Sequence, residues 1–435
     1  MSGRSPQRDA GRVRGWAGAL GTRGLPPAFW WLWASTLVNR LGTFAVPFLT
    51  LYLTVERGRS AAFAGLVAAA FAVGGTGGAL AGGAAADRFG CRRALVGAHL
   101  GTAAATAALG LSTGPEALFA AAFALGCTTG AARPATAALM SALLGPGDRV
   151  RAFSLDYWAM NLGFSVSVLL AGLAARTGYP VLFLADAAAT LLCALVVLLR
   201  VPSPPSPPPC DSGTDAAGGP APRRAPSPGH RALLADRPFL CCVLLFVLVA
   251  AVLQQMTTML PVAMAADGLS PAACGTVIAL NGVLVCLAQL PAGRLFDGRS
   301  PFRLLALAAA LCGTGFGLTA FAGSAPAYAL TVAVWTAGEV ISGPVSLELT
   351  ARFARARAAG RYQGASAFAW SAGGVLAAAA GGWTYDRLGP AVLWSACALA
   401  GLTAAAGFLA LARHAPAPVP SDGPSGPVGD HRVRE

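Results

Sequence analysis

Three ionisable side chains interrupt long apolar stretches of this 435-residue sequence. Glu339 lies about 12 residues into one stretch, Arg40 about 11 residues into another, and Arg133 stands directly before Pro134 in a third. A charge surrounded by hydrocarbon is costly, so such residues usually face a partner or a water-filled cavity. A carboxylate at this depth can bind a cationic or polar molecule, or carry a proton when the loss of water favours its neutral form. A buried acid paired structurally with an arginine is the alternative.

Other polar residues complete a candidate binding space. At helical spacing Trp335, Glu339 and Ser342 share one face. Asp186 lies one to two turns into its stretch and is either a second proton site or a carboxylate near the membrane surface. The neutral candidates are Asn39, Gln254, Gln255, Asn281, Gln289 and Asn161. Because Gln254 and Gln255 are adjacent, we expect them to face different ways.

The composition indicates a polytopic membrane protein. Hydrophobic residues make up 55% of the chain and charged residues 11%, against about 45–50% and about 25% in soluble domains. All 31 basic residues are Arg; 25 of them fall in alternate gaps between apolar stretches, and only four fall in the other gaps. This pattern predicts that both termini are cytoplasmic, and it explains the net charge of +13 without nucleic acid.

A bilayer-spanning helix needs about 20 apolar residues, and the sequence contains twelve such stretches in two sets of six. The predicted spans are 29–54, 61–85, 93–112, 116–142, 155–176, 180–200, 238–263, 271–294, 303–322, 327–351, 363–383 and 390–412. We therefore predict an all-α membrane protein with a disordered N-terminus (1–28), a six-helix bundle (29–200), a Pro-rich cytoplasmic linker (201–236), a second bundle (237–412) and a disordered tail (413–435).

The two sets are copies of one unit. A shift of 210 residues pairs Gly65 with Gly275, Gly163 with Gly373 and Gly172 with Gly382 without a gap. It also pairs a charged loop after the second span with one after the eighth span. The first loop holds Gly83, Asp87, Arg88, Gly90, Arg92 and Arg93, and the second holds Gly293, Asp297, Arg299 and Arg303. We interpret the chain as a tandem duplication, an arrangement that transporters share.

Twelve spans in two copies, with the motif Gly-x-x-x-Asp-Arg-x-Gly-x-Arg-Arg between the second and third, resemble the major facilitator superfamily. Cys91 stands where the family places a basic residue, and in the second loop Gly298 and Ser300 replace Arg88 and Gly90. The resemblance implies two pseudo-symmetric six-helix bundles, with a cavity lined by helices 1, 4, 7 and 10.

The resemblance also implies roles for single residues. Asp87 and Asp297 would face the starts of helices 11 and 5 in one conformation, as latches, or these charges would only set topology. Arg133 resembles the helix-4 arginine of superfamily proton antiporters, so it serves either coupling or interface anchoring. The stretch from Asn161 to Gly172 lacks the Gly-Pro pair that these antiporters carry in helix 5.

We therefore expect a secondary transporter that works by alternating access, as a proton-coupled exporter of small organic, drug-like molecules. Uptake or facilitated transport of a metabolite is the alternative that the missing Gly-Pro pair favours. A membrane scaffold or sensor without transport is the alternative from another class. We expect a monomer in the lipid bilayer of a bacterial plasma membrane.

Enzymatic chemistry is not expected. The chain has no Lys and therefore no phosphate-binding loop that ends in Gly-Lys-Ser/Thr. Its ten Cys are scattered mostly through apolar stretches, and its four His are not clustered. We predict no metal, no cofactor and no nucleic-acid partner.

Overall fold

The computed structural model describes residues 25–43, 45–144, 148–174, 178–203, 236–296, 299–353 and 359–414. The first bundle contains α2 (Pro27–Gly42), α3 (Ala45–Leu51), α4 (Ala61–Phe89), α5 (Cys91–Leu111), α6 (Pro115–Leu143), α7 (Arg149–Ala174) and α8 (Tyr179–Arg200). The second contains α10 (Arg237–Leu253), α11 (Leu260–Ala266), α12 (Pro271–Phe296), α13 (Pro301–Leu318), α14 (Ala325–Phe353), α15 (Ala359–Leu388) and α16 (Pro390–His414). The predicted N-terminal arm, most of the linker and the tail lie outside the described residues.

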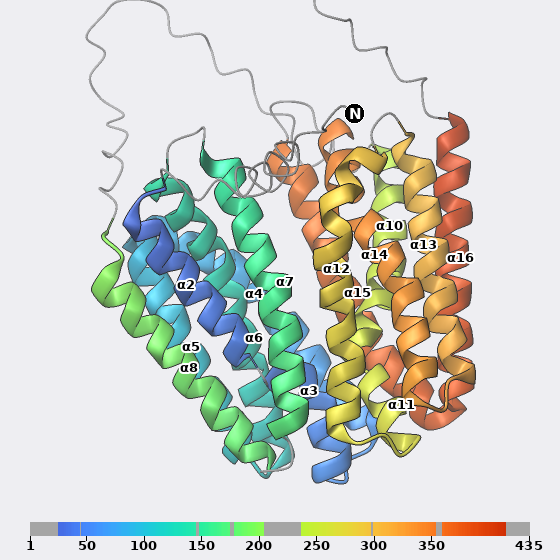
Figure 1. Cartoon of the computed structure of the whole chain (residues 1–435), viewed down its shortest axis with the longest axis horizontal. Helices are drawn as coiled ribbons and strands as arrows, with labels where there is room; N and C mark the ends of the chain where they lie inside the picture. The colour runs from blue at the N-terminus through green and yellow to red at the C-terminus, as the bar shows by residue number, and fades with distance from the viewer. Residues whose placement is uncertain are drawn as a thin grey trace, which may run out of the picture.

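These helices make the predicted twelve spans. The first span is α2, α3 and a π-helical turn (Tyr52–Glu56), and the seventh is α10, a 3-10 turn (Gln254–Met256) and α11. Nine of the described spans are long and apolar enough to cross a bilayer by composition alone. The other three, α6, α7 and α15, are placed by their packing against α4, α12 and α10. Figure 1 shows the two bundles side by side.

We call the face where α2 and α10 begin and α8 and α16 end the linker face, at the top of Figure 1, and the opposite one the far face. Successive spans reverse direction in very short loops. Only Gly90 separates α4 from α5, and its φ of +87° lies in the left-handed region. A residue with a Cβ would be strained there, so the glycine of the charged loop is required by the turn itself.

The duplicated glycines join the two bundles. Gly65 of α4 lies against Gly382 of α15, where a Cβ added to either would be 3.2 Å from the other's Cα. Gly172 of α7 lies against Gly275 of α12 in the same way, at 3.1 Å. The four residues are the partners of two repeat pairs, so the crossings are related by the internal two-fold symmetry. Small residues let membrane helices approach this closely.

A second pair of equivalent crossings lies within the bundles. A Cβ on Gly163 of α7 would be 2.5 Å from the Cβ of Arg40 on α2. A Cβ on Gly373 of α15 would be 2.5 Å from the Cβ of Ala250 on α10, which is the repeat partner of Arg40. In the second bundle an alanine is therefore sufficient for the packing at this crossing. The arginine in the other half is not needed for packing.

Two helices begin earlier than predicted. Helix 5 begins at Arg149 rather than 155, and helix 11 begins at Ala359 rather than 363. Both extensions contain arginine, with Arg149 and Arg151 in helix 5 and Arg361 in helix 11. Arginine is a good helix former, and its long side chain can reach the membrane surface from inside a span.

Candidate functional site

The first and seventh spans are both interrupted near mid-length. Pro47 in α3 and Pro261 in α11 each lie four residues after a threonine, Thr43 and Thr257. A proline has no N–H to bond the carbonyl four residues before it, and its ring clashes with that carbonyl, so the helix breaks. Helix breaks at corresponding positions of two repeats are typical of transporter binding sites.

Hydroxyl groups satisfy the two freed carbonyls. Ser167 of α7 donates from Oγ to Thr43 O at 2.6 Å, within the first bundle. Thr50 of α3 donates from Oγ1 to Thr257 O at 3.4 Å, from the first bundle to the second. Irregular backbone in a membrane must find such partners. The broken helices therefore support each other where the bundles meet.

Three charged residues of the first bundle lie within electrostatic range of one another, and we call them the N-cluster: Arg40 (α2), Arg133 (α6) and Asp156 (α7). Arg133 is exposed, whereas Arg40 and Asp156 are half-buried. Asp156 lies within electrostatic range of both arginines, and Arg40 also lies within range of the buried His99 on α5. Oδ1 of Asp156 is buried and accepts no hydrogen bond. One acid within range of two arginines leaves this region with a net positive charge. Oδ1 of Asp156 can accept a proton or a hydrogen bond from a ligand.

Glu339 of α14 is held in the second bundle by a different set of groups. Nδ2 of Asn281 on α12 donates to Oε2 of Glu339 at 2.6 Å and lies 3.0 Å from Oγ1 of Thr336. Asn281 is buried, whereas Glu339 is only half-buried. Glu339 lies near the middle of a 29-residue helix. The structure thus places the predicted Glu339 and Asn281 in contact, at mid-membrane depth.

The predicted charges divide into two groups. Arg40 and Arg133 lie in the N-cluster, and Glu339 is bonded within the other bundle. Asp186 of α8 is buried and accepts from Thr190 Oγ1 at 3.5 Å, and Thr190 in turn accepts from Asn39 Nδ2 at 3.2 Å. Asn39, the residue before Arg40, is therefore linked through Thr190 to Asp186, and these polar contacts tie α2 to α8.

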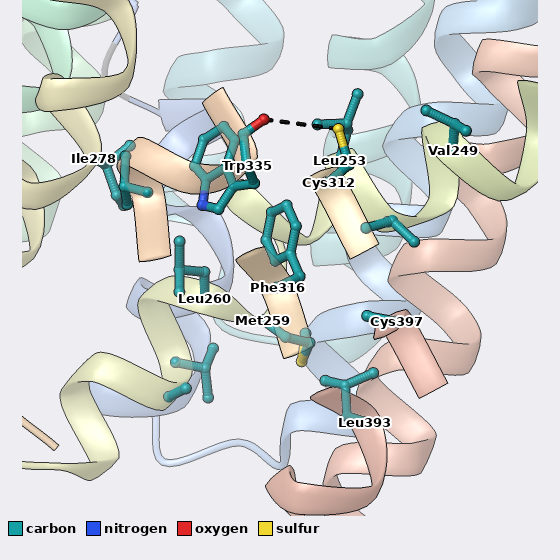
Figure 2. Packing of buried hydrophobic residues seen from close by; sticks show 14 of the residues in the cluster. Val249, Leu253, Met259, Leu260, Ile278, Cys312, Phe316, Trp335, Leu393 and Cys397 are labelled. Atoms are coloured by element: carbon teal, nitrogen blue, oxygen red, sulfur yellow. Dashed lines mark hydrogen bonds between the residues drawn. The ribbon is translucent and has the colours of Figure 1, made fainter. Parts of the chain in front are cut away.

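Trp335, a predicted site residue, packs against a neighbouring helix of the second bundle. Its side chain has no exposed surface, and its ring stacks on Phe316 of α13 with the centroids 5.1 Å apart. Figure 2 shows the indole enclosed by Phe316, Cys312, Ile278 and Leu260. It therefore packs inside the second bundle and offers no surface to a ligand in this conformation.

The two glutamines both lie against α15, at different depths. Gln255 donates from Nε2 to Ala377 O at 3.3 Å and accepts from Thr258 Oγ1 at 2.8 Å. Nε2 of Gln254 would be 3.0 Å from a Cβ on Gly374, a glycine that also faces Ala72 of α4. The 3-10 turn separates their directions, so Gln255 stabilises the break and Gln254 lies at the junction of the bundles.

The charged loops lie at the linker face. Asp87 and Arg88 are exposed, and the Arg88 guanidinium lies 5.4 Å from the centroid of the Phe89 ring. Arg92 donates to the Leu198 carbonyl and, at 3.0 Å, to Ser203 Oγ at the end of α8. Arg93, Arg299 and Arg303 are exposed as well, and Gly83 and Gly293 lie within α4 and α12. Asp297 lies outside the described residues, so its predicted latch is not tested.

A carboxylate that was not predicted from the sequence joins the two bundles at the far face. Asp386 near the end of α15 accepts from the backbone N–H groups of Ala61 at 3.0 Å and Ala62 at 2.6 Å, the first residues of α4. An acid at a helix N-terminus satisfies unpaired N–H groups and is favoured by the helix dipole. The bond joins the two bundles four residues beyond the Gly65–Gly382 crossing.

Asp386→Ala should open the far face. Loss of a helix cap costs about 1 kcal/mol, so the population closed at the far face should fall about fivefold relative to the open one. Distances between spin labels at the far ends of α4 and α15 would report this population. Asp386→Asn keeps an acceptor oxygen and should recover part of the loss; an unchanged distance distribution in Asp386→Ala would show that the cap does not hold the bundles.

The sequence of the chain matches the profile of the Major Facilitator Superfamily over residues 32–378, most of its length. The chain belongs to this superfamily. Its curated relatives include Multidrug resistance protein MdtH of Aeromonas salmonicida, 28% identical over 361 residues that cover 82% of this chain and 87% of the relative. YqjV of Bacillus subtilis, an uncharacterized MFS-type transporter, is 25% identical over 369 residues, which cover 83% and 87%.

Solved structures of other transporters have the same fold. The nucleoside transporter NupG superposes with a TM-score of 0.76 at 14% identity over 88% of this chain and 99% of that one. The POT family transporter PepTSo superposes with a TM-score of 0.75 at 17% identity over 90% and 99%. Family and fold together identify this superfamily member as a multi-pass membrane transporter rather than an enzyme.

Asp156, Thr50 and Asp386 were not predicted from the sequence. The signal for Asp156 was available: once α7 begins at Arg149, the acid lies two turns inside the helix rather than at its edge. Pro47 and Pro261 inside apolar stretches were also available and predict the two breaks. Asp386 and Ala61 are 325 residues apart, and no local pattern links them.

Proposed function

We propose that this superfamily member is a proton-coupled exporter of small organic molecules that works by alternating access. The observation that carries the proposal is the pairing of Glu339 with Asn281 at mid-membrane depth, opposite a bundle whose Asp156 has a buried oxygen without a hydrogen bond. Each bundle therefore supplies one carboxylate in apolar surroundings, where a proton is held or released as neighbouring charges change.

Glu339 is the proposed proton carrier. An ionised carboxylate in the membrane interior is costly unless it is paired, and the Nδ2–H of Asn281 is the partner that supports the charged form. A proton on Glu339 removes the charge and lets the bundle move without carrying an ion through hydrocarbon. A cationic substrate that approaches Glu339 would compete with that proton. This competition couples the movement of the substrate to the movement of the proton.

The N-cluster is the proposed counterpart. Arg40 replaces the alanine that packs at the equivalent crossing of the other half, so its charge serves the site rather than the packing. Asp156 offsets part of the positive charge of Arg40 and Arg133. Protonation of Asp156 would increase the net positive charge near the substrate, which provides a second way to link proton and substrate binding.

The contacts between bundles support alternating access. The Asp386 cap and the Gly65–Gly382 and Gly172–Gly275 crossings lie toward the far face, where the bundles are joined. Asp87 at the other end of α4 is exposed. The resemblance to the superfamily implies that it would cap the start of α15 in the opposite state. The same two helices would then be latched at either end by one carboxylate each.

Orientation and substrate follow from charge and from the relatives. The arginine bias of the loops supports a cytoplasmic linker face, which makes the present state closed to the outside. The name of the MdtH relatives, multidrug resistance protein, supports drug-like substrates. Helix 5 lacks the Gly-Pro pair that superfamily antiporters carry, and its Gly163 and Gly172 pack against neighbouring helices. The missing pair favours uptake as the second candidate.

A vesicle experiment tests the proposal. Purified protein in sealed vesicles should transport ethidium, a lipophilic cation, against its gradient when a pH gradient is imposed, and should stop when a protonophore is added. Transport that follows the ethidium gradient alone, at the same rate with and without the pH gradient, would contradict proton coupling. Accumulation in the same direction as the proton flow would establish uptake instead of export.

A further inference from the structure

A deep crevice opens on the side of the first bundle, away from the site described above. It has a volume of about 600 Å³ and lies between α4 and α5, with α6 as its floor. Small side chains line it except at one end, where Phe89 and Arg93 stand. The lining residues include Gly77, Ala81, Ala85, Gly97, Thr128 and Ala131.

The crevice is kept open by glycines that do not serve in packing. At Gly101 an added Cβ would be 2.6 Å from Thr128, so that glycine brings α5 onto α6. At Gly77 and Gly97 an added Cβ would meet nothing within 4 Å. Both glycines line the crevice and leave it unfilled. The helices α4 and α5 thus each contact α6 and leave a space between themselves.

The crevice spans one leaflet of the membrane. From Gly77 to Phe89 an α-helix rises about 18 Å, close to half of the hydrocarbon thickness of about 30 Å. Exposed apolar residues, Val73 and Leu80, continue along the same side of α4, with 49% and 78% of their surface exposed. This side of the bundle therefore faces lipid, and the open end of the crevice reaches the linker face.

The buried part of an occupant must be hydrocarbon. Thr128 is the hydroxyl residue of the lining, and its Oγ1 already donates within its own helix, to Ala124 O at 3.0 Å or Leu125 O at 3.2 Å. No other side chain in the lining between Gly77 and Ala85 carries a nitrogen or oxygen. Away from Arg93 at its mouth, the crevice therefore offers no free polar side chain that would recognise a drug-like substrate.

The end at the linker face is positively charged. Arg93 lines the mouth, and Arg88 lies on Phe89 beside it. Arg92, the residue before Arg93, donates to Ser203 just after the end of α8. Basic groups next to an apolar gap between membrane helices, at the height of the lipid head groups, are complementary to an anionic phospholipid. We propose that the crevice binds one acyl chain of an anionic phospholipid, with the lipid phosphate at Arg93.

Photo-crosslinking tests this site. The protein is reconstituted with a phosphatidylglycerol that carries a diazirine on one acyl chain, and the labelled peptides are mapped. We expect labelling concentrated in residues 77–98 and 127–131. Unlabelled phosphatidylglycerol should compete about fivefold better than phosphatidylcholine, the ratio expected for one basic contact with an anionic lipid.

Gly97→Leu tests the binding of the acyl chain in the crevice, and Arg93→Gln tests the contact with the lipid head group. Gly97→Leu should fill the crevice and remove most of the labelling, whereas Gly364→Leu, at another exposed helical glycine with open space around it, should leave labelling unchanged. Arg93→Gln should keep the labelling and bring the two competitors to equal strength. Labelling spread evenly over all lipid-facing helices, equal competition in the wild type, or displacement by ethidium rather than by lipid would each overturn the proposal.

Discussion

Glu339→Gln is expected to abolish proton-driven accumulation of substrate, with a loss of about a hundredfold or more, as when a positioned proton-transfer group is removed. Glutamine keeps the size of the side chain, and its Oε1 still accepts from Nδ2 of Asn281. It cannot take up a proton. Movement of substrate down its own gradient should therefore remain while the response to the pH gradient is lost.

A second glutamate on the same helix provides the control. Glu348 lies nine residues further along α14, is half-exposed and forms an ion pair with Arg352 at 2.5 Å. Glu348→Gln changes the same functional group on the same helix and should leave coupling intact. If Glu339→Gln still accumulated ethidium in vesicles as the wild type does, Glu339 would not be the proton carrier.

Arg40→Ala is expected to lower the free energy of unfolding by about 1–2 kcal/mol, less than the cost of about 3–5 kcal/mol that follows when a directly bonded buried ion pair loses one partner. Arg40 lies within electrostatic range of Asp156, so its loss leaves that carboxylate less compensated. The effect is limited because Arg133 also lies within electrostatic range of Asp156. Packing should not contribute, since Ala250 occupies the equivalent crossing in the second bundle. Chemical unfolding in detergent would measure the change.

The double variant Arg40→Ala with Asp156→Asn tests whether the stability loss in Arg40→Ala comes from the charge left on Asp156. If the uncompensated carboxylate is responsible, the second change should restore most of the lost stability. Transport should stay defective, because the N-cluster has lost both its acid and one arginine. Equal instability of the single and double variants would instead show that Arg40 is needed for packing or for another partner.

The repeat made much of the fold predictable. Gly65, Gly172, Gly275 and Gly382 were paired by the 210-residue shift alone, and the structure places them at the two crossings between the bundles. Close approach of two helices requires small residues on both, so a duplicated chain keeps them in register. Arg40, Arg133 and Glu339 were predictable because a charge within a long apolar stretch needs a physical reason.

Side-chain direction and contacts between distant segments were not predictable. Trp335 shares a helical face with Glu339 in projection, but it lies one turn away and meets Phe316 of α13, whose position the sequence does not reveal. Asp386 lies among exposed residues at the end of α15. Its role as a cap depends on the start of α4, which is distant in the sequence. Asp156 was lost to an error of six residues in the start of a helix.

Proton release on substrate binding tests whether Glu339 exchanges its proton for substrate. Purified protein in weakly buffered detergent solution is mixed with ethidium, and a pH indicator records the protons set free. We predict about one proton released per site at a pH where Glu339 holds its proton, and none from Glu339→Gln at saturating ethidium. Binding without release in the wild type, or the same release from Glu339→Gln, would contradict it.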